Sequence, residues 1–464
     1  MDYGRFFVTT PIYYVNDNPH IGHAYSTIAA DILARYWQGR GAQTYFLTGA
    51  DEHGMKIARS ALAAGQSPKE FVDKVTDKYK EVWQALNLKY SNFIRTTDPE
   101  HEKFVQDFVQ KLHDNGDIYQ DKYEGLYCVG CEEYKKEDEL EPGNICSLHK
   151  KPCEKVEENI YFFKLSKYQD KIIEAIQSKK FLIEPEARRN EIFKFIAKEP
   201  LRDLAISRSK VEWGIPIPWD KNQTIYVWVD ALLNYISGSK GFWPPQLQII
   251  AKDIFRFHAI IWPAMLLATG YELPEKLFIH GYFTINGQKM SKSLGNVVDP
   301  VEISKVYGVD ALRYFVMAEV PFGADGDFSL DRFDQRYRAD LANDLGNLLQ
   351  RVIVMAKNAK VHWEYEPMTK KYPEFDQAME ELKFSEALNF VWKMISEANV
   401  RIDAEKPWEL AKVDPEKNEK LLQNLLDTLS DIAGLLEPFM PETSHKMIEQ
   451  LRTGKQEPLF PRKK

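Results

Sequence analysis

The chain has 464 residues, too many for one hydrophobic core, with 44% hydrophobic and 28% charged residues and a formal net charge of −8. The acidic balance argues against indiscriminate binding to nucleic acid, although a local basic face could still bind RNA. The most apolar run, at residues 260–267, is too short to cross a membrane. The N-terminal residues lack a signal-peptide pattern, so we expect a cytoplasmic location and no contact with membranes.

Strand and helix patterns alternate in residues 1–115. A strand is expected at residues 6–9, a helix at 19–37 and a second strand at 45–48, and this alternation is typical of a parallel sheet. Residues 116–223 are irregular and rich in Cys, Glu and Lys, which indicates an inserted module.

The alternation returns in residues 224–329. A strand at 224–229 leads into Asp230, a candidate helix N-cap, and a strand at 247–250 leads into Asp253. We therefore expect an α/β fold in which one doubly wound (Rossmann-like) parallel sheet is split by the insertion.

Only helical periodicity remains in residues 330–464. Residues 383–403 and 418–436 have this period, and so does an apolar stripe in the first part of the region. We predict a separate all-α helical bundle. The stripe consists of Leu341, Leu345, Leu348, Val352 and Met355.

The motif His20-Ile-Gly-His23 follows Asn18 and Pro19. Asn18 is a good N-cap and Pro19 a good first helical residue. Both histidines should then lie in the first turns of a helix, where free backbone N–H groups and the helix dipole favour an anion. Gly22 leaves room for a flat ligand such as adenine. By itself the motif could equally be a helix start with two surface histidines.

A second motif, rich in lysine and serine, follows the tight-turn signal Asn286-Gly287. Two lysines and two serines on a loop suit a phosphate clamp that stabilises charge developing on pyrophosphate. A solvated basic loop is the simpler alternative. The motif consists of Lys289, Met290, Ser291, Lys292 and Ser293.

Together the two motifs, which bracket a split parallel sheet, resemble those of the class I aminoacyl-tRNA synthetases. The resemblance implies that His20 and His23 serve the adenylate transition state, while Lys289 and Lys292 serve the phosphates of ATP, which is bound with Mg2+. No covalent enzyme nucleophile is implied, because positioning and electrostatics carry this chemistry. The implied ATP-binding residues are His20, Gly22, His23, Lys289, Met290, Ser291, Lys292 and Ser293.

Doubly wound sheets bind ligands beyond the carboxyl ends of their strands. The residues expected there combine one carboxylate, Asp51, which could hold an ammonium group, with aromatic and aliphatic groups and a histidine. Such a lining suits a thioether, which makes good contacts with aromatic rings, although any one of these residues alone would more simply belong to the core. The set is Ile12, Tyr14, Asp51, Trp228, Ala231, Leu232, Tyr235, Ile254 and His258.

Nearly the whole chain resembles the methionyl-tRNA synthetases. The resemblance implies that the chain activates L-methionine with ATP, releases pyrophosphate and transfers methionine to tRNA(Met), with the nine residues above as the methionine pocket. The insertion is short, so we expect no separate editing domain, and the resemblance implies that any rejection of homocysteine occurs in the synthetic site. The matching stretches include Thr9-Thr-Pro-Ile-Tyr-Tyr14, Thr48-Gly-Ala-Asp-Glu-His-Gly54, Asp203-Leu-Ala-Ile-Ser-Arg208, Trp213-Gly-Ile-Pro-Ile-Pro218 and Val227-Trp-Val-Asp-Ala231.

All four cysteines, Cys128, Cys131, Cys146 and Cys153, lie in one short stretch. Cys128-Val-Gly-Cys131 and Cys146-Ser-Leu-His149 form two knuckles whose spacing suits tetrahedral zinc. Three cysteines with His149 are favoured over four cysteines and over no metal. The single-zinc form of the family resembles the first option and implies one structural Zn2+ in the insertion.

Asn347 and Arg351 share one helix face, away from the apolar stripe. Such a pair can contact base edges in a splayed RNA loop, although two surface polar residues would be the simpler explanation. The stretch from Asp344 to Arg351 resembles the anticodon-binding helix of the family, in which the matching pair reads the CAU anticodon.

The sequence departs from the family in two places. Family members also stack an anticodon base on a late Trp, but the last Trp here is Trp408, in a stretch that looks structural. The chain stops at Lys464, without the oligonucleotide-binding domain that dimerises many bacterial members. We therefore expect a monomer, with weaker tRNA affinity or a separate partner subunit.

Two alternatives fit part of this pattern. A cofactor adenylyltransferase with a His-x-Gly-His site would explain the phosphate motifs but not the cysteine knuckles, the helical bundle or the late lysines. A non-catalytic tRNA-binding or assembly protein descended from a synthetase need not keep His20, His23, Lys289 and Lys292.

Overall fold

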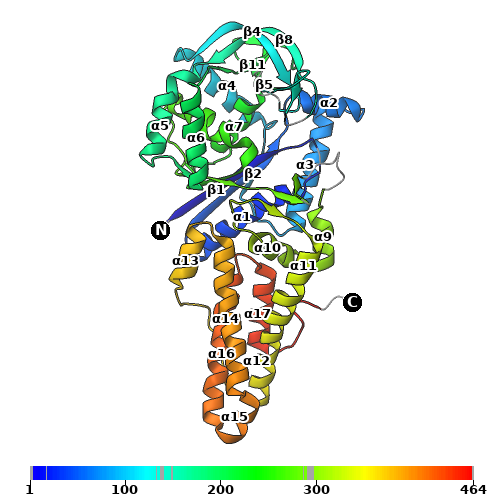
Figure 1. The fold of residues 1–464 in the computed structure, drawn as a ribbon, viewed down its shortest axis with the longest axis vertical. Helices are drawn as coiled ribbons and strands as arrows, with labels where there is room; N and C mark the ends of the chain where they lie inside the picture. The colour runs from blue at the N-terminus through cyan, green and yellow to red at the C-terminus, as the bar shows by residue number, and fades with distance from the viewer. Residues whose placement is uncertain are drawn as a thin grey trace.

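The computed structural model describes residues 4–16, 18–131, 133–135, 140–147, 150–285, 287–289 and 297–461. Three parts follow one another along the long axis of the molecule (Figure 1): the insertion at the top, a parallel sheet in the middle and a helical bundle below. This architecture confirms the predicted α/β fold with a split sheet and an all-α bundle.

The central sheet has six parallel strands in the order β3-β2-β1-β14-β15-β9. The direction of winding reverses between β1 and β14, so the carboxyl ends of these two strands flank a crevice of the kind that binds ligands in doubly wound sheets. The strands are β1 (Arg5–Tyr14), β2 (Gln43–Asp51), β3 (Asn92–Arg95), β9 (Leu182–Glu184), β14 (Leu247–Ala251) and β15 (Lys276–His280).

Two strands differ from expectation. β9 lies inside the segment assigned to the insertion, yet it pairs in parallel with β15 at the edge of the central sheet. The strand expected at 224–229 is instead β13 (Asp220–Ile225), which belongs to a small antiparallel sheet with β11 (Ser207–Arg208) and β12 (Pro216–Ile217). Both strands are short or half-exposed, so the sequence pattern did not show which sheet they join.

The helices of the α/β part surround the sheet (Figure 1). The first of them, α1, is buried on almost every side because it contacts three sheet strands and α10. These helices are α1 (Ile21–Gly39), α2 (Met55–Ala63), α3 (Pro68–Ala85), α4 (Pro99–Asp114), α7 (Val227–Ser237), α8 (Trp262–Thr269), α9 (Pro300–Tyr307) and α10 (Val309–Ala318).

The insertion is built on a long antiparallel pair at the top of Figure 1. Two helices of the insertion flank β9 in the chain, one before it and one after it. Its elements are β4 (Ile118–Cys128), β5 (Glu133–Lys135), β6 (Leu140–Glu141), β7 (Ile145–Cys146), β8 (Glu154–Phe163), α5 (Gln169–Gln177), α6 (Glu186–Lys198) and β10 (Leu204–Ala205).

The bundle confirms the predicted helical region, with one difference in local geometry. The predicted stripe is buried from Leu341 to Val352 and half-buried at Met355. Its first half, however, lies in a π-helix, η6 (Tyr337–Gly346), because the backbone is wound more loosely there than a period of 3.6 assumes. The other bundle helices are α11 (Leu330–Arg336), α12 (Asn347–Asn358), α13 (Pro373–Glu380), α14 (Phe384–Glu405), α15 (Pro407–Val413), α16 (Pro415–Leu436) and α17 (Pro441–Thr453).

The sheet and the bundle share one hydrophobic core, and a buried arginine joins them. Arg313 of α10 is 0% exposed. Its guanidinium donates to Phe439 O at 2.8 Å and Pro438 O at 2.9 Å, in the turn between α16 and α17, and to Asp31 Oδ2 of α1 at 2.6 Å. Arg35 donates to the same oxygen at 2.7 Å. The helix that begins at the histidine motif is therefore tied to the bundle.

Within the described ranges, no helix combines the length and apolar character needed to cross a membrane. The expected cytoplasmic location stays a prediction.

Candidate functional site

The start of α1 carries a stacked pair of histidines. His20 is the N-cap, and its Nδ1 accepts the N–H of Gly22 at 3.0 Å, while the His20 N–H donates to Nδ1 of His23 at 3.1 Å. The two ring centroids lie 3.9 Å apart. Because each Nδ1 accepts a hydrogen bond, each neutral ring carries its proton on Nε2 and can act as a donor there.

This geometry corrects the expected helix start. The N-cap is His20 rather than Asn18, and Pro19 precedes the helix. The first helical N–H, on Ile21, is not free for an anion, because it donates to Val298 O at 3.1 Å. The next N–H is occupied by the His20 ring. The helix start therefore offers imidazole N–H groups as donors, in place of the backbone donors that we expected.

His23 is held as a neutral ring. Burial, and then the neighbouring His20, lower the pKa of His23 well below its ordinary value. Tyr13 of β1 donates to His23 O at 3.2 Å, and its ring meets the His23 ring edge-on with centroids 5.2 Å apart. A neutral Nε2–H donor can bind a phosphate oxygen at any pH at which the phosphate is ionised.

The lysine motif is described only at its start. β16 (Phe283–Ile285) and β17 (Gln288–Lys289) form a hairpin in which Gly287 has a φ of 72°, as the Asn-Gly signal predicted. Asp327 Oδ1 accepts the Gly287 N–H at 2.9 Å. The side chain of Lys289 and the whole of Met290, Ser291, Lys292 and Ser293 lie outside the described residues. Beyond them the chain returns to α1 through the Ile21–Val298 hydrogen bond.

Three predicted pocket residues lie at the carboxyl ends of neighbouring strands, as expected. Ile12 and Tyr14 end β1, Asp51 ends β2, and Tyr14 stands beside Asp51 in the parallel register. Asp51 is 8% exposed. The sequence placed these three correctly because the strands are parallel, so their ends meet at one edge of the sheet.

Four other predicted pocket residues lie on α7 and not at the end of a sheet strand. Asp230, the expected N-cap, is in the first turn of α7, whose N-cap is Tyr226. Trp228, Ala231, Leu232 and Tyr235 recur at spacings of three and four, so one face of the helix carries them all. Ile254 and His258 follow β14, in a 3-10 helix, η3 (Lys252–Ile254), and a π-helix, η4 (Phe257–Ile261).

His258 is fixed in orientation and charge. Its Nδ1 donates to Ile254 O at 3.0 Å, which leaves Nε2 to accept from the Tyr235 hydroxyl at 2.7 Å. Burial lowers the pKa of His258 to about 4, although the hydrogen bond to Ile254 opposes the shift. The Tyr235–His258 pair is therefore uncharged at neutral pH, and this part of the lining suits an apolar side chain of the ligand.

Three residues near α7 were not assigned to the site from the sequence. Phe257 stacks on Trp228 with ring centroids 3.8 Å apart and an interplanar angle of 9°. Arg208 lies with its guanidinium 4.1 Å from the centre of the Tyr226 ring. The third is Trp213, which lies between β11 and β12. Phe257 directly precedes His258, and Arg208 and Trp213 fall in stretches that resembled the family, so their positions in the sequence were the available signal.

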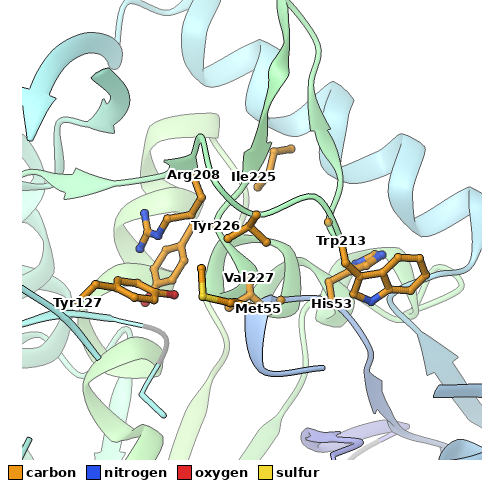
Figure 2. Close-up of a pocket in the computed structure, with 11 residues that line it drawn as sticks. His53, Met55, Tyr127, Arg208, Trp213, Ile225, Tyr226 and Val227 are labelled. Carbon is orange, nitrogen blue, oxygen red and sulfur yellow. The ribbon is translucent and has the colours of Figure 1, made fainter. Parts of the chain in front are cut away.

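A small cavity lies beside α7, at the junction of the insertion and the sheet (Figure 2). Figure 2 shows Arg208 next to Tyr226, and Trp213 next to His53. The ring centroids of Trp213 and His53 lie 5.4 Å apart. The cavity is lined by His53, Gly54, Met55, Tyr127, Arg208, Val211, Trp213, Gly214, Ile225, Tyr226 and Val227.

Three of the predicted metal ligands come together. The sulfurs of Cys128, Cys131 and Cys146 all lie within 4.8 Å of one another, an arrangement that could hold a metal ion. His149 lies outside the described residues. Cys153 is close enough to Cys128 for a side-chain hydrogen bond, so the four-cysteine alternative stays open.

Asn347 and Arg351 face a polar groove between α12 and α14. Asn347 is exposed, and Arg351 donates to Asp403 at 2.7 Å and to Asn399 at 3.5 Å. The groove is open and lined almost entirely by polar groups that can bond a base edge. Its lining is Asn343, Asp344, Asn347, Gln350, Arg351, Ser396, Asn399, Val400 and Asp403.

Comparison with known proteins agrees with this geometry. The family model of class I tRNA synthetases (M) matches residues 6–143 and 136–353, and that of the anticodon-binding domain of methionyl tRNA ligase matches residues 355–463. The methionine–tRNA ligase of Caldanaerobacter subterraneus is 46% identical over 96% of this chain and 74% of its own length. That of Rickettsia conorii is 42% identical over 98% of this chain and 94% of its own.

Solved structures of a Mycobacterium tuberculosis relative are similar over almost the whole chain. The methionyl-tRNA synthetase in complex with methionyl-adenylate superposes with a TM-score of 0.91 at 35% identity, covering 99% of this chain and 100% of that one. The apo form gives a TM-score of 0.84 at 32% identity, covering 99% and 98%. With its split parallel sheet, its histidine pair and its matching helical bundle, the chain belongs to the methionyl-tRNA synthetases, the methionine–tRNA ligases of class I.

Proposed function

We propose that the ligase activity resides in one site, in which the His20–His23 pair and the lysine motif serve ATP and the uncharged face of α7 holds methionine. The observation that carries this assignment is the capped histidine pair, whose Nε2 donors lie at the start of the helix that follows β1, next to the sheet's switch point. Such fixed donors stabilise charge that develops on phosphate oxygens.

The reaction has two steps. A carboxylate oxygen of methionine attacks the α-phosphorus of ATP, the bond from that phosphorus to the bridging oxygen breaks, and pyrophosphate leaves. A terminal ribose hydroxyl of tRNA(Met) then attacks the methionyl carbonyl, and AMP leaves. Mg2+ accompanies the ATP and offsets the charge of its phosphates. The ATP-binding residues are His20, Gly22, His23, Lys289, Met290, Ser291, Lys292 and Ser293.

Methionine is bound from both ends. Asp51 takes the ammonium group, and the thioether contacts the aromatic and aliphatic residues. Support comes from the paired ends of β1 and β2 and from the neutral Tyr235–His258 pair. The full pocket is Ile12, Tyr14, Asp51, Trp228, Ala231, Leu232, Tyr235, Ile254 and His258.

Three further assignments belong to this proposal. One structural Zn2+ is held by Cys128, Cys131, Cys146 and His149, a soft donor set typical of closed tetrahedral zinc. Asn347 and Arg351 read the anticodon from the polar groove. The chain divides at residues 1–115, 116–223, 224–329 and 330–464, and the second segment contributes β9 to the sheet. The expected monomeric state and cytoplasmic location stay predictions.

ATP–pyrophosphate exchange with each of the twenty amino acids tests the proposal. Exchange with methionine alone supports it. Exchange with none would favour a tRNA-binding protein without catalysis, and exchange with another amino acid would overturn the pocket assignment.

A further inference from the structure

A buried carboxylate joins two histidines beside the proposed methionine pocket. Asp230 accepts Nδ1–H of His53 on one oxygen at 2.8 Å and Nε2–H of His101 on the other at 2.7 Å. The exposed fractions are 1% for Asp230, 3% for His53 and 1% for His101. We call these three residues the His–Asp–His cluster. The sequence assigned no binding or positioning role to any of them, and it predicted only a helix N-cap at Asp230.

The His–Asp–His cluster joins three separate elements. His53 follows the end of β2 by two residues, His101 is in the first turn of α4, and Asp230 is in the first turn of α7. The other nitrogen of His101 lies 2.7 Å from Oγ of Ser237. Because Asp230 and Ser237 are two helical turns apart, His101 holds α7 along most of its length.

The loop that follows Asp51 is held from its other side as well. The indole N–H of Trp213 donates to Glu52 O at 2.6 Å, and the N–H of Gly54 donates to Trp213 O at 3.0 Å. With His53 bonded to Asp230, each of residues 52 to 54 makes a hydrogen bond either to α7 or to Trp213. Asp51 immediately precedes this clamped loop.

The charges around the cluster keep its carboxylate ionised. Burial alone would raise the pKa of Asp230, but the charge of His53 and the hydrogen bonds from both imidazoles lower it. Burial alone would lower the pKa of His53, but Asp230 and then the more distant Glu102 and Glu52 raise it. Glu102 Oε1 lies 3.7 Å from Nε2 of His53. An ionised Asp230 between two N–H donors is a stiff link, because charge-assisted hydrogen bonds are short and strong.

The two faces of α7 explain what this link could control. Asp230 and Ser237 face α4 and the β2 loop, whereas Trp228, Ala231 and Tyr235 recur on the face proposed to hold the methionine side chain. We propose that the His–Asp–His cluster positions α7 relative to Asp51, and so sets the side-chain length that the pocket accepts. This inference rests on the proposed function, since it assigns the ammonium group to Asp51 and the side chain to α7.

Substitutions at His53 separate this role from a merely structural one. The amide of His53→Asn can donate from nearly the same place as Nδ1, whereas His53→Leu cannot donate at all. The measurement is pyrophosphate exchange with methionine and with ethionine, whose side chain is one methylene longer. We expect His53→Leu to reduce the preference for methionine over ethionine by about tenfold, since a fitted pocket discriminates one methylene by that order. His53→Asn should keep most of the preference, and the ATP requirement of both variants should stay within about twofold.

A distant buried aspartate supplies the matched control. Asp431 in α16 accepts from Tyr372 at 2.6 Å and Lys370 at 3.0 Å, so Asp431→Asn also weakens a buried hydrogen-bonded carboxylate. It should lower the unfolding temperature without altering the methionine-to-ethionine ratio. An unchanged ratio in His53→Leu, or equal losses of preference in His53→Asn and His53→Leu, would overturn the inference. If His53→Leu does not fold, Asp230→Asn is measured in its place: a reduced methionine-to-ethionine ratio supports the inference, and an unchanged ratio overturns it. Failure of the unaltered chain to exchange with methionine would instead refute the proposed function.

Discussion

Tyr235 and His258 are joined by a hydrogen bond of 2.7 Å between the phenol oxygen and Nε2, in which the phenol is the donor because the other ring nitrogen donates to a carbonyl oxygen. Nδ1 donates its proton to Ile254 O, so a further proton on Nε2 would require the Tyr235 hydroxyl to change from donor to acceptor. Two polar side chains thus satisfy each other and present an uncharged surface, a lining in which a thioether binds without leaving polar groups unpaired.

Removing one partner of this pair should affect methionine far more than ATP. In Tyr235→Phe the buried Nε2 of His258 loses its hydrogen-bond donor. In His258→Ala the pocket loses the imidazole ring that lines it, and the Tyr235 hydroxyl loses its acceptor. We expect the methionine requirement in pyrophosphate exchange to rise by about tenfold or more, since an unsatisfied buried polar group costs about 1–3 kcal/mol. Trp228→Ala should act in the same direction. Equal increases in the methionine and ATP requirements would contradict the pocket.

The buried neutral histidines predict a pH dependence of stability. Burial lowers the pKa of His258 and of His280 to about 4, against 6.5 for an unperturbed imidazole. Between pH 6.5 and 4 the unfolded chain binds a proton on each ring that the folded chain does not. The free energy of unfolding should therefore fall as pH falls through this window, by up to about 1.4 kcal/mol per pH unit for each ring.

Comparison with a variant isolates this contribution from that of the carboxylates. His280→Asn loses the hydrogen bond to Ser26 at all pH values, but it has no proton to gain. Its unfolding temperature should lie below that of the parent at pH 7.5, and the gap should narrow as the pH falls toward 4.5. A gap that is constant with pH would show that His280 is not neutral in the folded chain.

The capping geometry of His20 separates helix stability from catalysis. Asn is a good N-cap, so His20→Asn should preserve the start of α1 while removing the Nε2–H donor. His20→Ala removes both, and loss of an N-cap costs about 1 kcal/mol. We expect both variants to lose about 100- to 1000-fold in pyrophosphate exchange, the usual effect of deleting one transition-state donor. Only His20→Ala should also unfold at a lower temperature. Full exchange activity in His20→Asn would show that the His20 imidazole takes no part in the mechanism.

Arg351 should matter for tRNA but not for the first step. Its guanidinium lies in the polar groove of the bundle, away from the sheet, so Arg351→Ala should impair aminoacylation at least tenfold, equivalent to about 1.4 kcal/mol of lost binding. Pyrophosphate exchange should be unchanged. Asp403→Asn, which removes the ion pair without removing the arginine, is the control. Loss of both activities in Arg351→Ala would show that the residue supports folding instead.

Metal content should decide between the two proposed ligand sets. Cys146→Ser should lose the bound zinc, because the Cys146 sulfur belongs to the three-cysteine cluster. Cys153→Ser should keep one zinc per chain if His149 is the fourth ligand, and His149→Ala should then lose it. Elemental analysis of the purified variants measures both. The opposite pattern, with zinc lost in Cys153→Ser and kept in His149→Ala, would assign a four-cysteine site.

The sequence predicted best where one periodicity dominates. The stripe from Leu341 to Val352 is buried, and Tyr14 stands beside Asp51, because spacing along a helix and strand direction in a parallel sheet dictate these positions. It failed where tertiary contacts decide. Asp230 resembled an N-cap after a strand, but in the fold its carboxylate bonds to two histidines more than 100 residues before it in the chain. His20 took the capping role because its ring accepts the Gly22 N–H while the His23 ring accepts the His20 N–H, a use of histidine that N-cap preferences do not anticipate.

The contacts of Arg313 limit how the molecule can be shortened. A catalytic fragment that ended before Pro438 would lose two of the three acceptors of this guanidinium, which would stay inside beside Asp31. Removing partners from a buried charge lowers the free energy of unfolding by about 3–5 kcal/mol, which is a large share of the stability of any domain. A minimal amino-acid-activating fragment, for screening or crystallisation, should therefore either retain the turn after α16 or exchange Arg313 and Asp31 together for apolar residues.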